Sequence, residues 1–422
     1  MLFIMNNTTR ISTFRSIFML GLSAVLLPVS AVAADAATAA NADTTIATAI
    51  TSGKAAVGLR YRAEQVDQDP LADDALASTV RIRLSYETAK WRDLSALVEV
   101  DHLASIGGET YNSTRNGRTS RPVVADPTAT DLNQAALKFA RGPDNVIFGR
   151  QRINLDNQRF IGNVGWRQNE QTYDGLLWST KRVPKTAFTY AYFDNVNRVF
   201  GPEQGVPAAD FRTDAHLVNA DWDFKSWGKL VAFGHLLDVS NAAAVSERTV
   251  GAHWAGTRKF GEAALAWSLA YAQQNDYADN PVKFSAHYTQ IELAGTRGPV
   301  TLRLGQEVLS GDASLPGRSF QTPLATLHAF QGWADKFLTT PPQGIDDRYV
   351  AVVGKWGATS AQLVWHDFQA EAVGRDYGTE WDASVGRKFG IVDVLLKGAR
   401  YNADGFGTDT TKLWLQLAAD FR

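Results

Sequence analysis

A strict two-residue alternation of apolar and polar side chains limits how this chain can fold. In the segment Val80–Glu87 (VRIRLSYE), apolar residues occupy the even positions and polar or charged residues the odd positions. The C-terminal segment 412–421 (KLWLQLAADF) shows a similar alternation. Because successive side chains of a β-strand point to opposite faces, the pattern predicts strands with one apolar face and one polar face.

Similar segments recur along the chain and predict about eighteen strands. The predicted strands are 54–66, 77–89, 94–104, 132–141, 145–152, 171–180, 185–194, 213–225, 229–240, 246–259, 262–275, 283–296, 299–308, 347–356, 358–369, 378–388, 391–403 and 409–421. No second apolar run is long enough for a transmembrane helix, which needs roughly 20 residues.

The connections between these strands alternate in length. Long stretches such as 105–131, 153–170 and 309–346 follow every odd-numbered strand, and short ones such as 90–93 and 142–144 follow every even-numbered strand. Transmembrane β-barrels of the outer membrane have short periplasmic turns and longer extracellular loops. The sequence therefore predicts an all-β, antiparallel transmembrane barrel with both termini on the periplasmic side.

Aromatic residues near the short turns support this prediction. The rings beside the short turns and the C-terminus are Trp91, Phe139, Trp227, Phe260, Trp356, Phe389 and Phe421. Such rings form girdles at the membrane–water boundary of barrels, although an ordinary soluble core is the alternative. The chain contains no cysteine, so a closed strand ladder rather than disulfides would supply its stability.

The N-terminal segment has the features of an export signal. Arg10 and Arg15 precede the short apolar run 17–27, and small residues at 31–33 suit a cleavage site. We expect a signal peptide at 1–34, a flexible periplasmic leader at 35–53 and an outer-membrane barrel at 54–422. An uncleaved signal anchor is the alternative.

The phase of the alternation assigns charged residues to the lumen, because a charge on the lipid face would be costly. Arg60 and Arg62 on the first strand and Arg81 and Arg83 on the second form a cluster that predicts contact with anions. Other predicted lumen residues are Glu64, Glu87, Glu99, Asp101, Lys138, Asp221, Asp223, Glu292, Arg303, Glu307, Asp382, Lys388, Lys397 and Lys412. The alternative is that these charges pair with one another across strands.

Two long connections have unusual sequences. Residues 149–172 are rich in Arg, Asn and Gln and contain Phe160 and Trp166. In the segment 305–347, Thr322 followed by proline predicts the start of a short helix whose apolar face would carry Phe330, Trp333 and Phe337. We expect this loop to fold into the mouth of the barrel and narrow it.

At these two segments the sequence resembles the alginate export family of outer-membrane proteins. The matching stretches are GRQRINLDNQRFIGNVGWRQNEQTYDG (149–175) and FQTPLATLHAFQGWADKFLTTPPQGIDD (320–347). The resemblance implies a monomeric eighteen-stranded barrel with an arginine-lined constriction through which an acidic polysaccharide passes. It assigns that role to Arg150, Arg152, Arg159 and Arg167.

Three functions remain open from the sequence. The first is a passive channel for an alginate-like anionic polysaccharide or oligosaccharide, with arginines binding carboxylates and the indoles of Trp166 and Trp333 packing on sugar faces. The second is a general or substrate-selective porin for small polar solutes. The third and weakest is a barrel hydrolase, because none of the seven histidines stands in a recognisable triad spacing.

The predicted substrate-binding residues are Arg60, Arg62, Arg81, Arg83, Arg150, Arg152, Arg159, Arg167, Arg303, Trp166 and Trp333. We predict no catalytic residue, cofactor, metal site or nucleic-acid partner. The predicted partners are an acidic polysaccharide or oligosaccharide, outer-membrane lipid and, as a further candidate, periplasmic secretion components.

Overall fold

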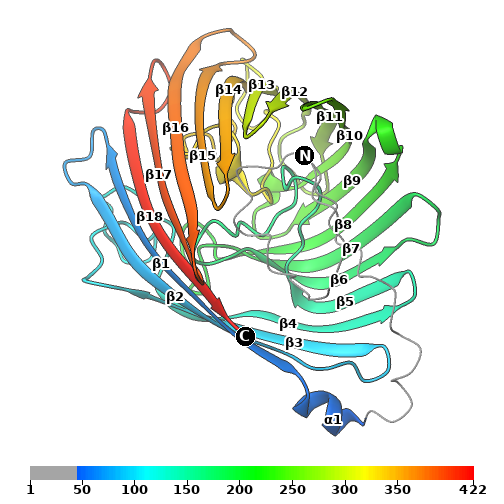
Figure 1. The fold of residues 1–422 in the computed structure, drawn as a ribbon. Helices are drawn as coiled ribbons and strands as arrows, with labels where there is room; N and C mark the ends of the chain where they lie inside the picture. Colours follow the sequence, from blue (N-terminus) through cyan, green and yellow to red (C-terminus); the bar gives the residue numbers. More distant parts are fainter. Residues whose placement is uncertain (1–44) are drawn as a thin grey trace.

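A computed structural model describes residues 45–422, which form one closed antiparallel barrel of 18 strands (Figure 1). Each strand pairs with its neighbours in sequence, and β1 closes the barrel by pairing with β18, with Leu59 opposite Ala419. The strands are β1 (Lys54–Gln68), β2 (Ala75–Glu87), β3 (Leu94–Ser105), β4 (Ala129–Arg141), β5 (Asp144–Gln151), β6 (Thr172–Thr180), β7 (Thr186–Asn197), β8 (Asp210–Asp223), β9 (Lys229–Val239), β10 (Glu247–Phe260), β11 (Ala263–Asp276), β12 (Ser285–Arg297), β13 (Val300–Leu309), β14 (Ile345–Trp356), β15 (Thr359–Gln369), β16 (Asp376–Phe389), β17 (Val392–Ala403) and β18 (Thr410–Phe421). The predicted fold class and strand number are confirmed.

Within residues 45–422, helical structure is confined to short segments. The helix α1 (Ile46–Thr51) precedes β1, and three 3-10 turns, η2 (Lys225–Trp227), η3 (Ala243–Val245) and η4 (Leu327–Ala329), lie in connections. Among the described residues, none of the helices is long and apolar enough to cross a membrane. The predicted signal peptide and most of the predicted leader lie outside the described residues, and α1 gives the last part of that leader a regular structure.

The connections are sorted by length as the sequence predicts. Tight turns such as 142–143, 261–262 and 390–391 join each even-numbered strand to the next, at the end of the barrel where β1 begins and β18 ends. The longest connections, 106–128, 152–171 and 310–344, all lie at the opposite end. By the rule for transmembrane barrels, the tight turns are periplasmic and the long loops extracellular.

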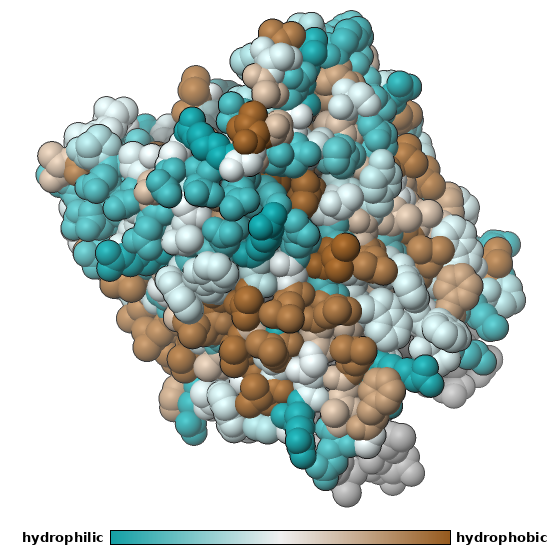
Figure 2. Space-filling view, turned by 90° about the horizontal axis from the view of Figure 1, so that it is seen from above, coloured by the Kyte–Doolittle hydropathy of each residue, from teal (hydrophilic) through white to brown (hydrophobic). Residues whose placement is uncertain are grey.

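The outer wall of the barrel is apolar. Outward-facing side chains such as Leu137, Phe148, Ile291 and Leu396 are each more than half exposed. Figure 2 shows a broad hydrophobic area on one face with hydrophilic residues bordering it. The aromatic residues Trp227, Phe260, Trp356 and Phe389 are exposed beside the tight turns, as predicted for a girdle at the membrane boundary.

The inside of the barrel is packed by the long loops. One apolar cluster joins Trp333 and Phe337 of the 310–344 loop to wall residues such as Tyr401, and a second joins Ile153 and Ile161 of the 152–171 loop to strands β6 to β9. The predicted inward folding of the 310–344 loop is therefore confirmed, and the 152–171 loop folds inward with it.

The predicted helix in the 310–344 loop is wrong. Only the single turn η4 forms, because Gln331, Gly332 and Asp335 have positive φ values of 48°, 79° and 61° that no right-handed helix accommodates. Instead of bonding to carbonyl groups one turn earlier, the backbone N–H groups of Trp333 and Ala334 donate to wall carboxylates.

Candidate functional site in the barrel lumen

The arginines of β1 and β2 point into the lumen and hold the 152–171 loop. Arg60 Nε donates to Gln168 Oε1 at 2.8 Å, and its Nη1 donates to the Gly165 carbonyl at 2.9 Å. Arg60 Nη2 also donates to the carbonyl of Arg167. Among the described residues, the guanidinium of Arg60 therefore has only neutral hydrogen-bond acceptors.

Arg62, two residues further along β1, contacts two extracellular loops. Its Nη2 donates to the Trp166 carbonyl and to Gln416 Oε1 at 2.9 Å, and its Nη1 lies 3.6 Å from Asp126 Oδ2. The guanidinium carbon lies 4.1 Å from the centroid of the Trp166 ring, a cation–π contact. The loop 106–128 thus contributes a carboxylate to the same site.

Glu170 of the 152–171 loop is the main counter-charge of the arginine cluster. Its carboxylate forms ion pairs with Arg83 and Arg152 and lies 3.6 Å from Arg81. Burial alone would raise the pKa of Glu170, but Arg152 and Arg83 outweigh it and hold the pKa well below its usual range. Glu170 is therefore ionised and neutralises part of the cluster.

The wall supplies further counter-charges. Arg83 makes a bidentate contact with Asp101, at 2.7 and 2.6 Å, and its Nε lies 3.4 Å from Glu99. For Arg83 the structure therefore shows the alternative, in which the charge pairs with acidic residues across strands. Arg60, by contrast, has no carboxylate within 4.0 Å among the described residues.

A second arginine of the 152–171 loop ties it to the other long loop. Arg159 donates to Glu307 of β13 at 2.5 Å and to Thr322 of the 310–344 loop at 2.8 Å. Its guanidinium also lies over the ring of Phe330, 4.8 Å from the centroid. Arg159 therefore positions both loops against one part of the wall.

Asp335 is the centre of a third set of contacts. It accepts hydrogen bonds from Arg167 at 3.0 Å and from Lys412 of β18 at 2.7 Å, and His328 Nδ1 lies 2.7 Å away. Through this one carboxylate the 310–344 loop is joined to the 152–171 loop and to the barrel wall.

Lys397 of β17 lies beside this carboxylate in a cage of indole rings. Its Nζ is 3.5 Å from the ring centroid of Trp333, 4.3 Å from that of Trp166 and 5.4 Å from that of Trp414. Its ammonium donates to His328 Nε2 at 2.7 Å. The two tryptophans predicted to pack on sugar faces thus surround a lysine of the protein itself.

On β16, the strand that pairs with β17, two carboxylates hold the tip of the 310–344 loop. Asp382 accepts the backbone N–H of Trp333 at 3.2 Å, and Glu380 accepts that of Ala334 at 2.7 Å. A side chain on Gly332 would clash with the Glu380 carboxylate, because its Cβ would lie 2.5 Å from the carboxyl carbon. The loop backbone therefore approaches the wall very closely here.

The loops leave little of the surrounding wall accessible to water. Inward-facing residues on six different strands around the barrel, Arg62, Asp101, Tyr173, Phe233, Glu307 and Glu380, are each no more than 5 % exposed. A wide water-filled passage would leave such residues exposed. The long loops therefore cover the wall at these positions, and a solute that crosses the lumen would contact loop residues rather than bare wall.

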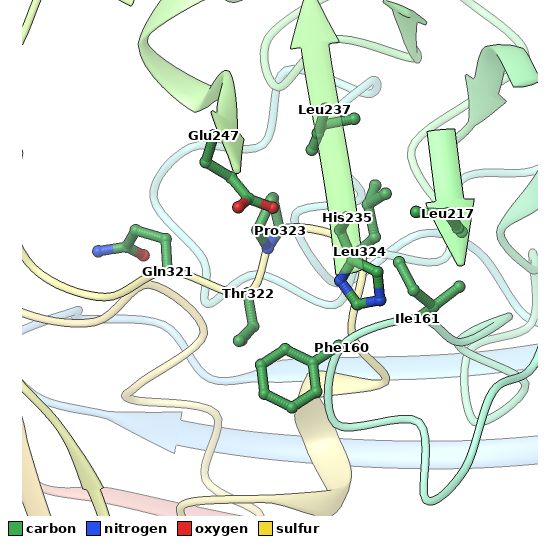
Figure 3. Close-up of a pocket in the computed structure, with 10 residues that line it drawn as sticks. All are labelled: Phe160, Ile161, Leu217, His235, Leu237, Glu247, Gln321, Thr322, Pro323 and Leu324. Atoms are coloured by element: carbon green, nitrogen blue, oxygen red, sulfur yellow. The ribbon is translucent and has the colours of Figure 1, made fainter. Parts of the chain in front are cut away.

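Figure 3 shows one place where the two long loops meet the wall. Phe160 and Ile161 of the 152–171 loop and Thr322 to Leu324 of the 310–344 loop surround a cavity of about 10 Å³ beside His235 of β9. A cavity of this size holds about one water molecule. A larger cavity of about 650 Å³ lies at the extracellular end between Asp276, Ser285 and Asp312.

Two of the predicted site residues, Arg150 and Arg303, are placed apart from this arrangement, whereas Arg152 belongs to it. Arg150 lies on the same face of β5 as the exposed Phe148, which is the outer face, and pairs with Asp174 at 2.8 Å. Arg303 faces the lumen between the outward-facing Leu302 and Leu304, nearer the periplasmic end. Arg152 follows β5 directly and joins Glu170 and Glu99.

Several residues of the site were missed from the sequence. Asp126, Gln168, Glu170, His328 and Asp335 lie in loops, where no two-residue alternation indicates the direction of a side chain. Lys397 was assigned to the lumen, but its indole cage was not predicted because its rings come from three distant segments. Within the described residues, no group of three or more His, Asp or Glu side chains is placed to hold a metal ion.

Comparison with solved structures decides the class of fold. OccAB4 from Acinetobacter baumannii superposes with a TM-score of 0.68 at 14% identity, covering 88% of this chain and 98% of that one. The outer membrane protein OpdK from Pseudomonas aeruginosa gives 0.67 at 14% identity, covering 87% and 98%. OccK2 (OpdF) from Pseudomonas aeruginosa, solved in complex with glucuronate, gives 0.67 at 13% identity, covering 89% and 98%. In its fold, the protein is a porin-like outer-membrane β-barrel.

These neighbours are outer-membrane porins, which agrees with the predictions of an outer-membrane location and of no enzymatic activity. No family model matches the sequence of this porin-like barrel. No curated protein matches it either. The resemblance to the alginate export family therefore gains no support beyond the barrel itself.

Proposed function

We propose that the protein is a substrate-selective outer-membrane channel for small anionic solutes, carboxylates in particular. The observation that carries the proposal is the arginine cluster of β1 and β2, which faces the lumen where the loops fill it. Three of its atoms, Arg62 Nε, Arg62 Nη1 and Arg81 Nε, are buried with no hydrogen-bond acceptor among the described residues. Guanidinium groups bind carboxylates through paired, charge-assisted hydrogen bonds.

The neighbours support small anions as the solute class. OccK2 has been solved in complex with glucuronate, and OpdK has been solved with vanillate. Both molecules carry one carboxylate on a ring, so a bidentate arginine contact suits them. Glucuronate is therefore the probe that we choose for this chain.

An acidic polysaccharide or oligosaccharide, as implied by the alginate-export resemblance, is the weaker reading. A polymer must thread through the lumen while the loop contacts of Glu170, Arg159 and Asp335 are displaced together. A small solute needs a smaller displacement. Block of the channel by mannuronate-rich oligomers, with no passage of glucuronate, would favour the polymer.

The test is transport by the purified barrel in liposomes. We expect uptake of glucuronate to exceed uptake of neutral glucose. The double variant Arg60→Gln and Arg81→Gln should lower glucuronate uptake about tenfold or more, because charge-assisted hydrogen bonds contribute about 1.5–3 kcal/mol each. The matched control is Arg150→Gln, which removes an arginine from the outer face and should leave uptake unchanged.

A further inference from the structure

The outer face of the barrel carries a set of arginines at its periplasmic end. They stand at or near the ends of even-numbered strands, where the tight turns begin. These residues, called the arginine belt, are Arg141, Arg182, Arg258, Arg297 and Arg387. All five are exposed.

Strand alternation places the belt on the side of the lipid. Arg258 stands two residues before the exposed Phe260 on β10, and Arg387 stands two residues before the exposed Phe389 on β16. Arg297 follows the exposed Leu293 on β12 at an even spacing. Residues at such spacings share one face of a strand, and here that face is the apolar outer wall.

Contacts with aromatic rings fix the height of two of these guanidinium groups. The Arg258 guanidinium carbon lies 5.8 Å from the ring centroid of Phe260, and that of Arg387 lies 5.1 Å from the ring centroid of Phe389. Both rings belong to the girdle that marks the boundary between hydrocarbon and water. The guanidinium groups therefore lie at the level of the lipid headgroups.

The belt has few counter-charges of its own. Arg182 pairs with Asp144, and Arg141 lies 3.9 Å from Asp93. Within residues 45–422, no carboxylate lies within 4.0 Å of Arg258, Arg297 or Arg387. At the extracellular end the distribution of charge is different, since the β1–β2 connection alone carries Asp69, Asp73 and Asp74.

We propose that the arginine belt binds the phosphate groups of anionic phospholipids in the periplasmic leaflet of the outer membrane. A planar guanidinium donates two parallel hydrogen bonds to a phosphate group. A zwitterionic lipid also has a phosphate, but its own headgroup cation competes with the arginine for that phosphate. The belt continues the lipid-facing wall, so its partner is the lipid already in contact with that wall. This inference does not depend on which solute crosses the lumen.

The test compares lipids retained by the purified barrel. The protein is placed in nanodiscs that contain equal amounts of phosphatidylglycerol and phosphatidylcholine, and native mass spectrometry counts the lipids that remain bound. We expect at least about fivefold enrichment of phosphatidylglycerol, because a basic residue near an anionic surface contributes about a factor of five. The enrichment should fall when the salt concentration is raised to 0.5 M.

The decisive variant replaces three belt residues, Arg258→Gln, Arg297→Gln and Arg387→Gln. It should lose the enrichment. The matched control, Arg248→Gln, Arg348→Gln and Arg400→Gln, removes three exposed arginines from the extracellular part of the barrel and should keep it. Folding of each variant is checked by its heat-modifiable migration in gels.

Two results would overturn the proposal. The first is equal retention of the two lipids by the unaltered protein, or an enrichment that does not respond to salt. The second is the same loss of enrichment in the control as in the belt variant. The salt series uses the unaltered protein, so it tests the binding of anionic lipid even when the belt variant does not fold.

Discussion

The indole of Trp166 and the imidazole of His328 stack face to face, with their ring centroids 4.6 Å apart and their planes inclined by 5°. The first residue belongs to the 152–171 loop and the second to the 310–344 loop. The stack, together with Asp335 and Lys397, joins the two loops against the wall formed by β17, β18 and β1. We call these four residues the loop junction.

Removing the imidazole should loosen the loop junction. Aromatic pairs contribute about 1 kcal/mol beyond their buried area, so His328→Asn should raise the population with displaced loops about fivefold. Single-channel recording in planar bilayers should show higher conductance or more frequent open events. The control is His216→Asn, because His216 lies on the outer face of β8 beside Tyr190. Unchanged recordings for His328→Asn would show that the stack does not restrain the loops.

Asp335→Asn should disrupt the loop junction more severely. It leaves Arg167 and Lys412 buried without their shared carboxylate, and breaking a buried ion pair in this way costs about 3–5 kcal/mol. The strand ladder does not depend on this contact, so the barrel should still fold. Trypsin should then cut the 310–344 loop at Lys336, whose half-buried side chain donates to Thr410 at 2.6 Å in the unaltered protein.

The control for this variant is Asp312→Asn, at the extracellular end of the same loop. Asp312 pairs with Arg318 at 3.1 Å, where both side chains are partly exposed. Pairs of this kind contribute little to stability, so the cleavage pattern should remain that of the unaltered protein. Equal cleavage of both variants would contradict the role assigned to Asp335.

The loop junction should also respond to acid. Burial, together with the neighbouring Lys397, lowers the pKa of His328 well below its ordinary value of 6.5, although Asp335 opposes this shift. A histidine whose pKa is lowered by folding stabilises the folded contact above its ordinary pKa, and that stability is lost as the pH falls below about 6.5.

The charged groups that face His328 are Asp335 of its own loop, Arg167 of the 152–171 loop and Lys397 of β17. A protonated imidazole would contact the Lys397 ammonium directly and would also be repelled by the charge of Arg167. Conductance should therefore rise between pH 7.5 and pH 5 in the unaltered protein, and His328→Asn should remove most of this change. An identical pH profile in the two proteins would assign the effect to other groups.

Glu170→Gln should make the lumen more selective for anions. Loss of this carboxylate frees positive charge on Arg81, Arg83 and Arg152. The permeability ratio of chloride to potassium, measured as a reversal potential, should rise a few-fold. The control is Glu203→Gln in the exposed connection 198–209. A ratio that falls or stays constant would mean that Glu170 does not face the path of the ions.

The sequence predicts the strands of the barrel wall far better than the loop contacts inside the lumen. In strands such as β2, alternation assigns Arg81 and Arg83 to the lumen because lipid excludes them from the other face. The strand number, the sorted loops and the exposed girdle follow from the same argument. The face of Arg150 could not be assigned from the sequence, because neither of its neighbours, Gly149 and Gln151, is a large apolar residue that marks the opposite face.

The arrangement of the loops inside the lumen depends on contacts between segments far apart in the chain. Glu170 meets Arg83, and Asp335 meets Lys412, only after the loops have folded inward. The helix predicted from Phe330, Trp333 and Phe337 failed because wall carboxylates bind the backbone that a helix would use. Helical spacing alone cannot detect such competition.

The proposed passage of small carboxylates through the arginine cluster is tested most directly by reversal potentials in a gradient of potassium glucuronate. The account predicts that glucuronate carries a measurable share of the current in the unaltered protein and in Arg150→Gln. It predicts that this share falls about tenfold or more in the variant Arg60→Gln and Arg81→Gln. An equal glucuronate permeability in all three proteins would contradict it.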